Sequence, residues 1–330
     1  MTGKTTACSI VIRAYNEEKH LGRLLEGIAQ QSVRDVQTII VDSGSTDSTL
    51  DIALAGNAHI VQISPEEFTF GRSLNRGIAK AQSEKIVVAS AHVYPVYPDW
   101  LERLLAPLDN PQTGLSYGKQ RGAETSHFSE KQVFAHWYPD QSNLMQDQPF
   151  CNNANLAIQR RLWNEHPFDE TLSGLEDVAW GKWVLEHGYH IAYIAEAEVI
   201  HVHNETPRAV YNRYKREAMA FKRIFPQEQF HLFDFLRLVS SNIASDLFHA
   251  IKLKTLWSNF HSIFWFRWMQ FWGTYHGYRQ SGPLTEKLRQ TFYYPARVEI
   301  KRQDMSRRVA PIQYNEAEIE RNLKDATKKA

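Results

Sequence analysis

Three short stretches of the chain carry side chains whose types and spacing could do chemistry. Asp42 ends an apolar run, and a carboxylate fixed at a strand end can accept hydrogen bonds from a ribose or a base. Glu176 and Asp177 open an apolar helical pattern, a position where carboxylates usually act as caps. His201 and His203 would share one face of a strand, which allows a pair of metal ligands or simply two structural histidines.

These side chains need ordered elements to position them, and residues 9–47 show the clearest ones. Ser9 to Ile12 is a short β-branched run, typical of a strand covered on both faces. Leu21, Leu24 and Ile28 recur at helical spacing, so the next segment should pack one face on a sheet. A second apolar run, 36–41, leads to Asp42. We therefore expect two loops side by side at the carboxyl ends of parallel strands, where open α/β sheets bind ligands.

The loop after the first strand should lead directly into its helix. Asn16 stands where an N-cap is expected, and Glu17 and Glu18 would occupy the first turn, where the helix dipole favours negative charge. No GxGxxG follows the strand, which disfavours a dinucleotide-binding site. An ordinary strand–helix–strand unit with a capping Asp42 is the plain alternative.

Further along the chain, strands and helices continue to alternate. Runs 59–63 and 86–89 are typical of strands, and 49–55, 73–81 and 99–108 are typical of helices. This alternation favours a doubly wound parallel sheet. Residues 117–150 show weak periodicity and read as a long loop of the kind that carries substrate contacts. Residues 189–194 and 198–202 are expected as two edge strands.

At this point the residues resemble a known family. The pattern Val11-Ile12-x-Ala14-Tyr15-Asn16-Glu17-Glu18, followed by Val41-Asp42-Ser43-Gly44-Ser45-Thr46-Asp47, is similar to the start of inverting family 2 glycosyltransferases. The resemblance implies the GT-A fold, a Rossmann-like, mostly parallel sheet flanked by helices. It also implies that the nucleotide of a sugar donor is held by the following residues: Ala14, Tyr15, Glu17, Asp42 and Ser43.

The stretch 71–88 also resembles the family, which has Asn and Gly in this helix before a strand that ends in Asp-x-Asp. By this resemblance Arg72 and Asn75 belong to the donor site. The expected carboxylate positions, however, hold Ser90, Ala91 and His92. Two carboxylates there would bind a divalent cation that holds the donor diphosphate, whereas Ser and neutral His bind a hard cation poorly. We expect these three residues to contact the donor, with plain strand-end residues as the alternative.

Two arrangements could neutralise the diphosphate. In one, His92 and either His201 or His203 hold a cation, and imidazole ligands would favour Mn²⁺ over Mg²⁺. In the other, no metal is needed, and Arg72, Arg76 and protonated histidines bind the phosphates directly. The sequence favours weak or absent metal dependence, because no carboxylate remains at the strand end.

The resemblance gives Glu176 and Asp177 the place of the catalytic acidic pair. It implies that Asp177 is the general base that takes the proton of the acceptor hydroxyl, and that Glu176 binds the acceptor or orients the loop. The helix N-terminus should depress the pKa of Asp177 and keep it ionised. In the family, the region around Asn153 lines the acceptor pocket, and we add Trp137 from the aromatic stretch before it.

The composition limits the classes of binding partner and the cellular compartment that we expect. The 330 residues are 43% hydrophobic and 23% charged, with a net charge of +1, so no strong field points to nucleic acid. Cys8 and Cys151 are the two cysteines, and Cys8 lies in an expected core strand, which fits a reducing cytosol. We see no apolar signal segment before residue 9 and no run near the ~20 apolar residues of a spanning helix. We expect a cytoplasmic protein, with peripheral contact at the inner face of the cell membrane left open.

The composition changes after about residue 205. We expect a catalytic domain over 1–205, with a donor half (1–110) and an acceptor half (111–205), a helical extension over 206–304, and a mobile charged tail over 305–330. The extension is rich in aromatic residues and carries flanking basic ones. Packing against the domain or a second subunit is one interpretation, which would give a homo-oligomer; contact with anionic lipid is the other.

The sequence thus predicts an inverting glycosyltransferase. It would move a sugar from a UDP- or dTDP-linked donor to a hydroxyl of a bacterial surface polysaccharide or a lipid-linked glycan. The stretch 201–204, followed by a helix rich in Tyr and Arg, resembles bacterial polysaccharide rhamnosyltransferases. An inactive sugar-nucleotide-binding or scaffolding protein is an alternative, because Asp-x-Asp is lost. A nucleotidyltransferase would need a Gly-rich basic loop after the first strand, which residues 13–16 do not supply.

Overall fold

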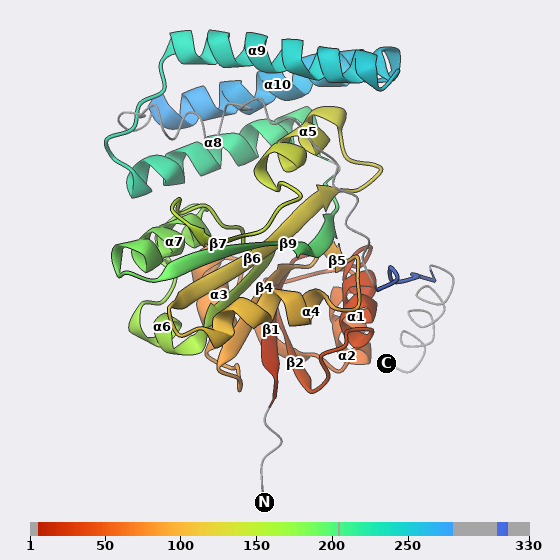
Figure 1. Cartoon of the computed structure of the whole chain (residues 1–330), viewed down its shortest axis with the longest axis vertical. Coiled ribbons are helices and arrows are strands. Elements are labelled where there is room, and N and C mark those ends of the chain that lie inside the picture. Colours follow the sequence, from red (N-terminus) through yellow and green to blue (C-terminus); the bar gives the residue numbers. More distant parts are fainter. Residues whose placement is uncertain (1–5, 204, 280–308, 316–330) are drawn as a thin grey trace, which may run out of the picture.

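The computed structural model describes residues 6–203, 205–279 and 309–315. A mixed sheet carries helices on both faces, and three long helices form a separate layer beyond one end of the strands (Figure 1). The strands are β1 (Cys8–Ala14), β2 (Val36–Asp42), β3 (His59–Gln62), β4 (Lys85–Ser90), β5 (Val93–Pro95), β6 (Thr113–Gly122), β7 (Asn143–Gln146), β8 (Asn155–Gln159) and β9 (His190–His201). The helices are α1 (Leu21–Ala29), α2 (Thr49–Ala55), α3 (Phe70–Ile78), α4 (Trp100–Leu105), the 3₁₀ helix η1 (Ala106–Asp109), α5 (Phe128–Trp137), α6 (Arg160–Glu165), α7 (Glu176–Glu186), α8 (Pro207–Ile224), α9 (Leu232–Lys252) and α10 (Leu256–Arg279).

The first half of the sheet is parallel, as predicted. The strand order is β3-β2-β1-β4-β8-β6-β9-β5, with β7 paired to β9. Strand β1 lies between β2 and β4, and its register pairs Ala14 with Asp42 and Arg13 with Ser90. The loops that follow these three strands therefore leave the sheet at the same edge, which brings residues from 13, 42 and 90 onward close together.

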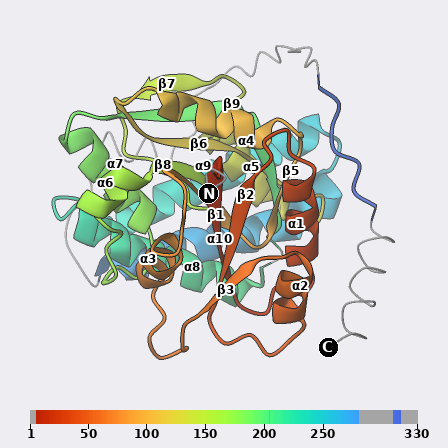
Figure 2. The same cartoon turned by 90° about the horizontal axis from the view of Figure 1, so that it is seen from below.

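Alternation along the strands builds two cores, one on each face of the sheet. Ile10 and Ile12 point to the face covered by α1 and α4, whereas Val11 points to the face covered by α3 and α7. Seen from below, α1 and α2 lie on one side of strands β1 to β3, and α3, α6 and α7 lie on the other (Figure 2). Helices cover both faces of β1, which explains why its residues are mostly buried and its central ones β-branched.

The second half of the sheet differs from the expected parallel order. Strand β8 runs antiparallel to both β4 and β6, while β6 and β9 run parallel. The two predicted edge strands are one continuous strand, β9, which pairs with β6, β5 and β7. The predicted gap at 195–197 lies where the pairing of β9 with β6 shifts register, and the strand continues through it.

The expected long loop over 117–150 is also wrong in part, because it contains the end of β6, all of α5 and the short β7. Strand β6 was hidden by its buried polar and small residues, such as Ser116, Gly118 and Gln120. A side chain at Gly118 would overlap the carbonyl oxygen of Ala197 and the amide of Asn155, so this position accepts only glycine. Such strands lack the hydrophobic alternation on which sequence interpretation depends.

The loop after β1 does not cap the first helix. Asn16 has a positive φ of 55°, and α1 begins only at Leu21, after His20. The Asn16 side chain instead accepts a hydrogen bond from the backbone N–H of Thr46 (2.8 Å), and its own N–H donates to Ser45 Oγ (2.9 Å). The predicted N-cap is therefore wrong, because Asn16 joins the loop after β1 to the loop after β2.

Helices α8, α9 and α10 form the layer beyond the strand ends (Figure 1). Their shared core includes Phe221 of α8, Phe235 of α9 and Phe271 of α10. Gly273 and Gly277 lie where α10 crosses α8, and a Cβ at either position would overlap the backbone of that helix. The four-residue glycine spacing thus permits a close contact between α10 and α8.

A short segment near the end of the chain lies against the sheet. The backbone N–H of Ile312 donates to the carbonyl oxygen of Val96 (3.0 Å), and the Tyr314 hydroxyl donates to that of Pro95. Residues 309–315 of the predicted mobile tail are therefore docked beside β5. The other tail residues, 305–308 and 316–330, and residues 280–304 of the predicted extension lie outside the described residues.

Candidate active site

A pocket of about 580 Å³ opens between the strand ends and helices α5 and α8. The sequence predicted several of its lining residues from separate parts of the chain. These are Glu17, Ser90, His92, Trp137, Asn153, Glu176, Asp177, His201 and His203. The structure thus brings the expected acidic pair, the histidines and two acceptor candidates to one cavity.

Other predicted donor residues lie beside this pocket rather than in its lining. Ala14 and Ala91 are buried, and Tyr15 is 57% exposed. Asp42 is buried at the end of β2, where its carboxylate accepts hydrogen bonds from the backbone N–H groups of Gly44 (3.0 Å) and Ser45 (3.1 Å). Asp42 therefore shapes the turn 42–45. The Ser43 hydroxyl donates to the carbonyl oxygen of Ala14 (3.3 Å), which ties the ends of β1 and β2 together.

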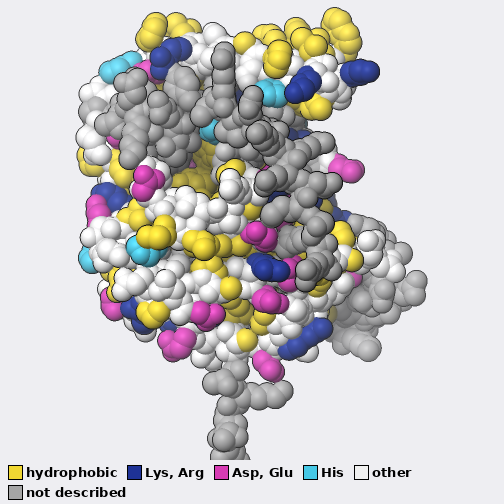
Figure 3. All heavy atoms as spheres, viewed as in Figure 1, with side chains coloured by type: hydrophobic (Ala, Val, Ile, Leu, Met, Phe, Trp, Pro, Cys, Tyr) yellow, Lys and Arg dark blue, Asp and Glu magenta, His cyan; other side chains and the backbone are white. Residues whose placement is uncertain are grey.

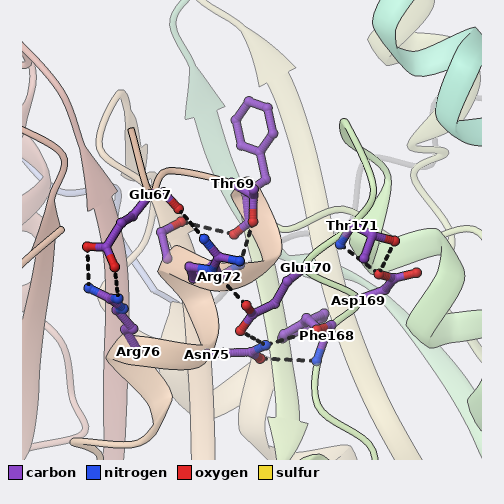
Figure 4. Close-up of polar contacts among 11 residues, drawn as sticks. Glu67, Thr69, Arg72, Asn75, Arg76, Phe168, Asp169, Glu170 and Thr171 are labelled. Carbon is purple, nitrogen blue, oxygen red and sulfur yellow. Dashed lines mark hydrogen bonds and ion pairs between the residues drawn. The ribbon is translucent and has the colours of Figure 1, made fainter. Parts of the chain in front are cut away.

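Arg72, Asn75 and Arg76 are engaged outside the pocket lining (Figure 4). Arg72 Nε pairs with Glu170 Oε2 at 2.8 Å, and Asn75 Nδ2 donates to Oε1 of the same carboxylate at 3.1 Å. Arg76 pairs with Glu67 at 2.8 Å. These contacts tie α3 to the segment before α7 and to its own preceding loop. Arg72 and Arg76 thus already have carboxylate partners, whereas the metal-free arrangement expected from the sequence has them bind phosphates.

Glu176 lies at the first position of α7 and is held from two sides. Its Oε1 accepts hydrogen bonds from Arg13 Nη1 and Asn153 Nδ2, both at 2.9 Å. The preceding residue, Leu175, has a left-handed backbone with φ of 57°, which is uncommon for a residue with a branched side chain. This bend directs the start of α7 toward the pocket, so that both members of the acidic pair line it.

Asp177 uses both carboxylate oxygens on backbone donors. Oδ2 accepts from the N–H of Asn153 and Oδ1 from that of Val178, each at 2.8 Å. Burial and the neighbouring negative charge of Glu176 nevertheless raise the pKa of Asp177 to about 7, against the lowering effect of these amides. The expected depression of this pKa is therefore wrong, because desolvation of the carboxylate exceeds the effect of the helix N-terminus.

Three histidines from two distant segments lie together in the same pocket. The rings of His92 and His201 stack with centroids 5.0 Å apart, and those of His201 and His203 lie 4.0 Å apart. Each Nδ1 is hydrogen-bonded to a side-chain oxygen: His92 to Glu17 Oε1 (2.7 Å), His201 to Gln120 Oε1 (2.7 Å) and His203 to Glu130 Oε1 (2.8 Å).

Backbone pairing fixes this histidine cluster. His92 immediately precedes β5, and β5 pairs with the end of β9, with Val93 opposite His201. The N–H of Val202 donates to the carbonyl oxygen of His92 at 3.0 Å. Burial lowers the pKa of both His201 and His203 well below the usual value. These two histidines are therefore neutral at pH 7, so the expectation that protonated histidines face the phosphates is wrong for them.

Sequence reasoning missed several lining residues, among them three arginines and a phenylalanine on which two of the arginines pack. The guanidinium groups of Arg13 and Arg216 each lie 4.8 Å from the centre of the Phe70 ring. All three line the pocket. A third arginine, Arg213, also lines it but pairs with Glu130 at 2.7 Å. No motif marks Arg13 or Phe70 in the sequence, and Arg216 was counted there only as one of several basic residues of a helix.

The sheet, the pocket and the acidic pair that lines it are consistent with the family found by comparison with known proteins. Residues 9–166 match the model of the family described as Glycosyl transferase family 2. This match covers just under half of the chain, and together with the fold it supports a glycosyltransferase of the GT-A kind.

Among characterised proteins, the chain is similar to two O-antigen chain rhamnosyltransferases. It is 27% identical to RfbN of Salmonella typhimurium over 219 residues, which cover 62% of this chain and 69% of that protein. It is 29% identical to WbaN of Salmonella anatum over 204 residues, which cover 56% of this chain and 62% of that protein. The chain thus spans about two thirds or less of the length of these relatives.

One solved structure shows how far the fold likeness extends. The mannosyltransferase PcManGT of Pyrobaculum calidifontis, solved with GDP-Man and Mn²⁺, superposes with a TM-score of 0.54 at 17% identity. The superposition covers 84% of this chain and 85% of that one. At this level of identity the likeness supports the fold alone.

Proposed function

We propose that the protein transfers a sugar, with inversion, from a UDP- or dTDP-linked donor to a hydroxyl of a bacterial surface polysaccharide or lipid-linked glycan. The observation that carries the proposal is the buried pair Glu176 and Asp177 at the rim of a pocket that Arg13 and the histidine cluster also line. The similarity to O-antigen chain rhamnosyltransferases supports a glycan acceptor and favours a deoxyhexose donor.

The reaction needs one base and one stabilised leaving group. Asp177 takes the proton of the acceptor hydroxyl as its oxygen forms a bond to the anomeric carbon. The bond from that carbon to the diphosphate oxygen breaks, and its electron pair leaves with the diphosphate. A single displacement of this kind inverts the anomeric centre. The raised pKa of Asp177, about 7, makes it a stronger base than an ordinary aspartate while leaving it substantially ionised at neutral pH.

The arginines of the pocket are the cations best placed for the donor diphosphate. Among the described residues, Arg216 Nε is buried and has no hydrogen-bond partner, and its guanidinium lies over Phe70. Arg13 lies over the same ring but is already paired with Glu176. We assign Arg216 the role that the metal-free arrangement gives to Arg72 and Arg76. A charge-assisted hydrogen bond from this guanidinium would stabilise the charge that builds on the leaving oxygen.

The acceptor side of the proposal involves Asn153 and Trp137. Asn153 positions both acids, since its side chain donates to Glu176 and its backbone N–H donates to Asp177. Trp137, at the end of α5, packs its edge on Phe150 with ring centroids 5.0 Å apart and lines the pocket. A sugar ring packed on this aromatic side chain would lie on the side of the pocket that adjoins the base.

The decisive experiment compares the wild type with Asp177→Asn in transfer and donor hydrolysis, using UDP- and dTDP-linked sugars. We expect donor affinity, measured by calorimetry, to change little and turnover to fall by ~10²–10⁴-fold, the usual weight of general-base catalysis. Asp147→Asn is the matched control, because Asp147 is exposed and does not line the pocket. Turnover within threefold of wild type in Asp177→Asn would remove Asp177 from this role.

The same experiment distinguishes the transferase from an inactive sugar-nucleotide-binding protein and from a nucleotidyltransferase. An inactive sugar-nucleotide-binding protein is suggested by Ser90 and His92, which replace the carboxylates of Asp-x-Asp. Such a protein would bind a nucleotide diphosphate and show neither transfer nor hydrolysis with any donor. A nucleotidyltransferase, for which the pocket offers no Gly-rich phosphate loop among its lining residues, would instead release pyrophosphate from a nucleoside triphosphate.

The outer face of the helical layer supports a second element of the proposal, contact with a membrane surface. Large apolar side chains are exposed along α9, α10 and their connection: Phe233, Leu236, Phe248, Ile251, Leu253, Trp257, Phe260, Phe264 and Trp268. Trp257 is 89% exposed. Figure 3 shows such side chains gathered along the top of the molecule, with Lys and Arg among them. We call this surface the α9–α10 face.

Its charge favours anionic lipid over a second copy of the chain. Arg237, Lys252 and Lys254 are exposed, whereas the two acidic residues of segment 231–279, Asp234 and Asp246, are buried. Two such faces in contact would bring only positive charges together. An anionic bilayer complements both the apolar and the basic side chains. In the described part of the chain, no helix has the length and hydropathy to span a membrane.

A further inference from the structure

The histidine cluster has the atomic arrangement of a metal centre. One ring nitrogen from each of His92, His201 and His203 lies within 4.8 Å of the others. In a tetrahedral zinc-type site each nitrogen lies ~2.0–2.1 Å from the ion, so the ligand nitrogens lie about 3.3–3.4 Å apart. Two nitrogens 4.8 Å apart would therefore need to approach by about 1.5 Å, which requires the side chains to rotate when an ion binds.

The hydrogen bonds of the three rings decide which nitrogens can bind. Glu17, Gln120 and Glu130 place a side-chain oxygen 2.7–2.8 Å from each Nδ1, so Nδ1 carries the proton and donates it to that oxygen. In the neutral form of each ring the lone pair then lies on Nε2. Metal-binding histidines typically donate their other N–H to a carboxylate or an amide oxygen in this way, which fixes the ring and its tautomer.

A buried atom without a partner supports the same conclusion. His201 is 5% exposed, and within the described residues its Nε2 has no hydrogen-bond partner. A buried ring nitrogen that is left unpaired costs free energy, which a bound ion would recover. The His201 ring centroid lies 5.0 Å from that of His92 and 4.0 Å from that of His203, so this ring belongs to the shared cluster.

A second group of potential ligands in the pocket is already neutralised. Glu130, His203 and Glu205 also lie close enough to share an ion. Arg213, however, pairs with Glu130 at 2.7 Å and with Glu205 at 2.5 Å, and its guanidinium occupies the place that a cation would take. The available ligands are therefore the imidazoles and not the carboxylates.

We propose that His92, His201 and His203 bind one divalent transition-metal ion through their Nε2 atoms, at the place where related transferases use the carboxylates of Asp-x-Asp. Three imidazoles favour Zn²⁺ or Co²⁺, and more weakly Mn²⁺, over Mg²⁺, which prefers oxygen ligands. The sequence favoured weak or absent metal dependence; this inference replaces that expectation. The catalytic role of this metal ion rests on the proposed transferase function, because such an ion would stabilise the charge of the departing diphosphate.

Metal binding can be measured without donor or acceptor. The purified protein, stripped of metal with EDTA and dialysed, is titrated with Co²⁺ while its visible d–d absorption is recorded. We expect one equivalent to bind and to be displaced by Zn²⁺, while Mg²⁺ at about a thousandfold excess leaves the spectrum unchanged. His92→Gln and His203→Gln should each weaken binding by about 100-fold or more. Glu17→Gln, which loosens the acceptor of His92, should weaken it by ~10–100-fold.

The control variant is His187→Gln, because His187 is exposed and does not line the pocket. Circular dichroism confirms that each variant is folded. His92→Gln and His203→Gln carry the test, because replacing the buried His201 by alanine can prevent folding. A folded wild type that binds no Co²⁺, or variants that bind as the wild type does, would overturn the metal site. Such a failure leaves the transferase proposal intact if turnover survives in EDTA. Stoichiometric Co²⁺ binding without turnover on any donor would contradict the transferase proposal and leave the metal site standing.

Discussion

Arg13 and Glu176 form an ion pair of 2.9 Å although 163 residues separate them in the chain. Arg13 lies at the end of β1, and Glu176 is the first residue of α7. The glutamate side chain is 4% exposed, so the pair is largely removed from solvent. It joins the donor half of the domain directly to the acidic pair of the candidate active site.

The first prediction concerns the stability that this pair supplies. Arg13→Leu would leave a buried carboxylate without its cation, and such losses cost about 3–5 kcal/mol. We expect a value near the lower end, because Asn153 still donates to Glu176. The double variant Arg13→Leu/Glu176→Gln should recover most of the lost free energy of unfolding. Urea denaturation of the single and double variants measures both effects, and a single variant as stable as the wild type contradicts this account.

The second prediction is a pH dependence of the transfer step. The pKa of Asp177 is raised to about 7, first by burial and then by the charge of Glu176. A general base acts when deprotonated, so turnover should be near its maximum above pH 7 and fall about tenfold per pH unit below it. Glu176→Gln removes one cause of the shift, so the midpoint of the profile should move to lower pH. A profile that is flat from pH 5 to 8 would exclude Asp177 as the titrating base.

The third prediction concerns Asp42 and the nucleotide. If its carboxylate accepts hydrogen bonds from a ribose or base, Asp42→Ala should weaken nucleotide binding by ~1.5–3 kcal/mol. Because the carboxylate also holds the N–H groups of Gly44 and Ser45, Asp42→Asn is the better comparison, since an amide oxygen can keep the turn. Calorimetry with UDP and dTDP gives both affinities. A folded Asp42→Ala variant with unchanged affinity would place the nucleotide elsewhere.

The fourth prediction tests the α9–α10 face. The protein should sediment with anionic vesicles and be released by salt, because exposed charges are screened at high ionic strength. Lys252→Glu/Lys254→Glu should reduce the bound fraction strongly, at roughly 1 kcal/mol for each charge removed and more for its reversal. Trp257→Ser should do the same through lost apolar contact. The control is Lys80→Glu, an exposed residue just after α3, far from this face along the chain.

The structure also changes which tryptophans belong in that test. Of Trp265, Trp268 and Trp272 in the aromatic-rich extension, only Trp268 is exposed. Trp272 packs on Phe235 of α9 with ring centroids 5.4 Å apart. No association with vesicles, together with a stable dimer in solution, would support contact between subunits in place of a lipid surface.

The parts that the sequence predicted are those with local signals. The β-branched runs that became β1 and β4, the helix face of Leu21 and Leu24, and the acidic residues at the start of α7 all follow from the periods of helix and strand. The family pattern added the chemistry of the acidic pair. These signals predict that the carboxyl ends of β1, β2 and β4 lie at one edge of the sheet, as the strand pairing in the fold confirms for Ala14, Asp42 and Ser90.

The parts that the sequence could not predict depend on contacts between distant residues. The pairing of β5 with β9 brings His201 beside His92, and no periodicity encodes which of several strands will meet. The pKa of Asp177 depends on burial by elements from all over the chain, which outweighs the local helix dipole. Arg216 faces Phe70 for the same reason: only the packed fold shows that α8 covers the pocket.

The order of the chain has a consequence for its synthesis. The family match ends at residue 166, before Asp177, His201 and His203. The pairing of Val93 with His201 and the hydrogen bond from Val202 to the carbonyl oxygen of His92 close the histidine cluster only when β9 has joined the sheet. A nascent chain that has just completed the matched segment would therefore possess the Asp42 turn but neither Asp177 nor the full histidine cluster. The proposed base and the arginine proposed for the diphosphate, Arg216, would both join the site only after later residues have been synthesised.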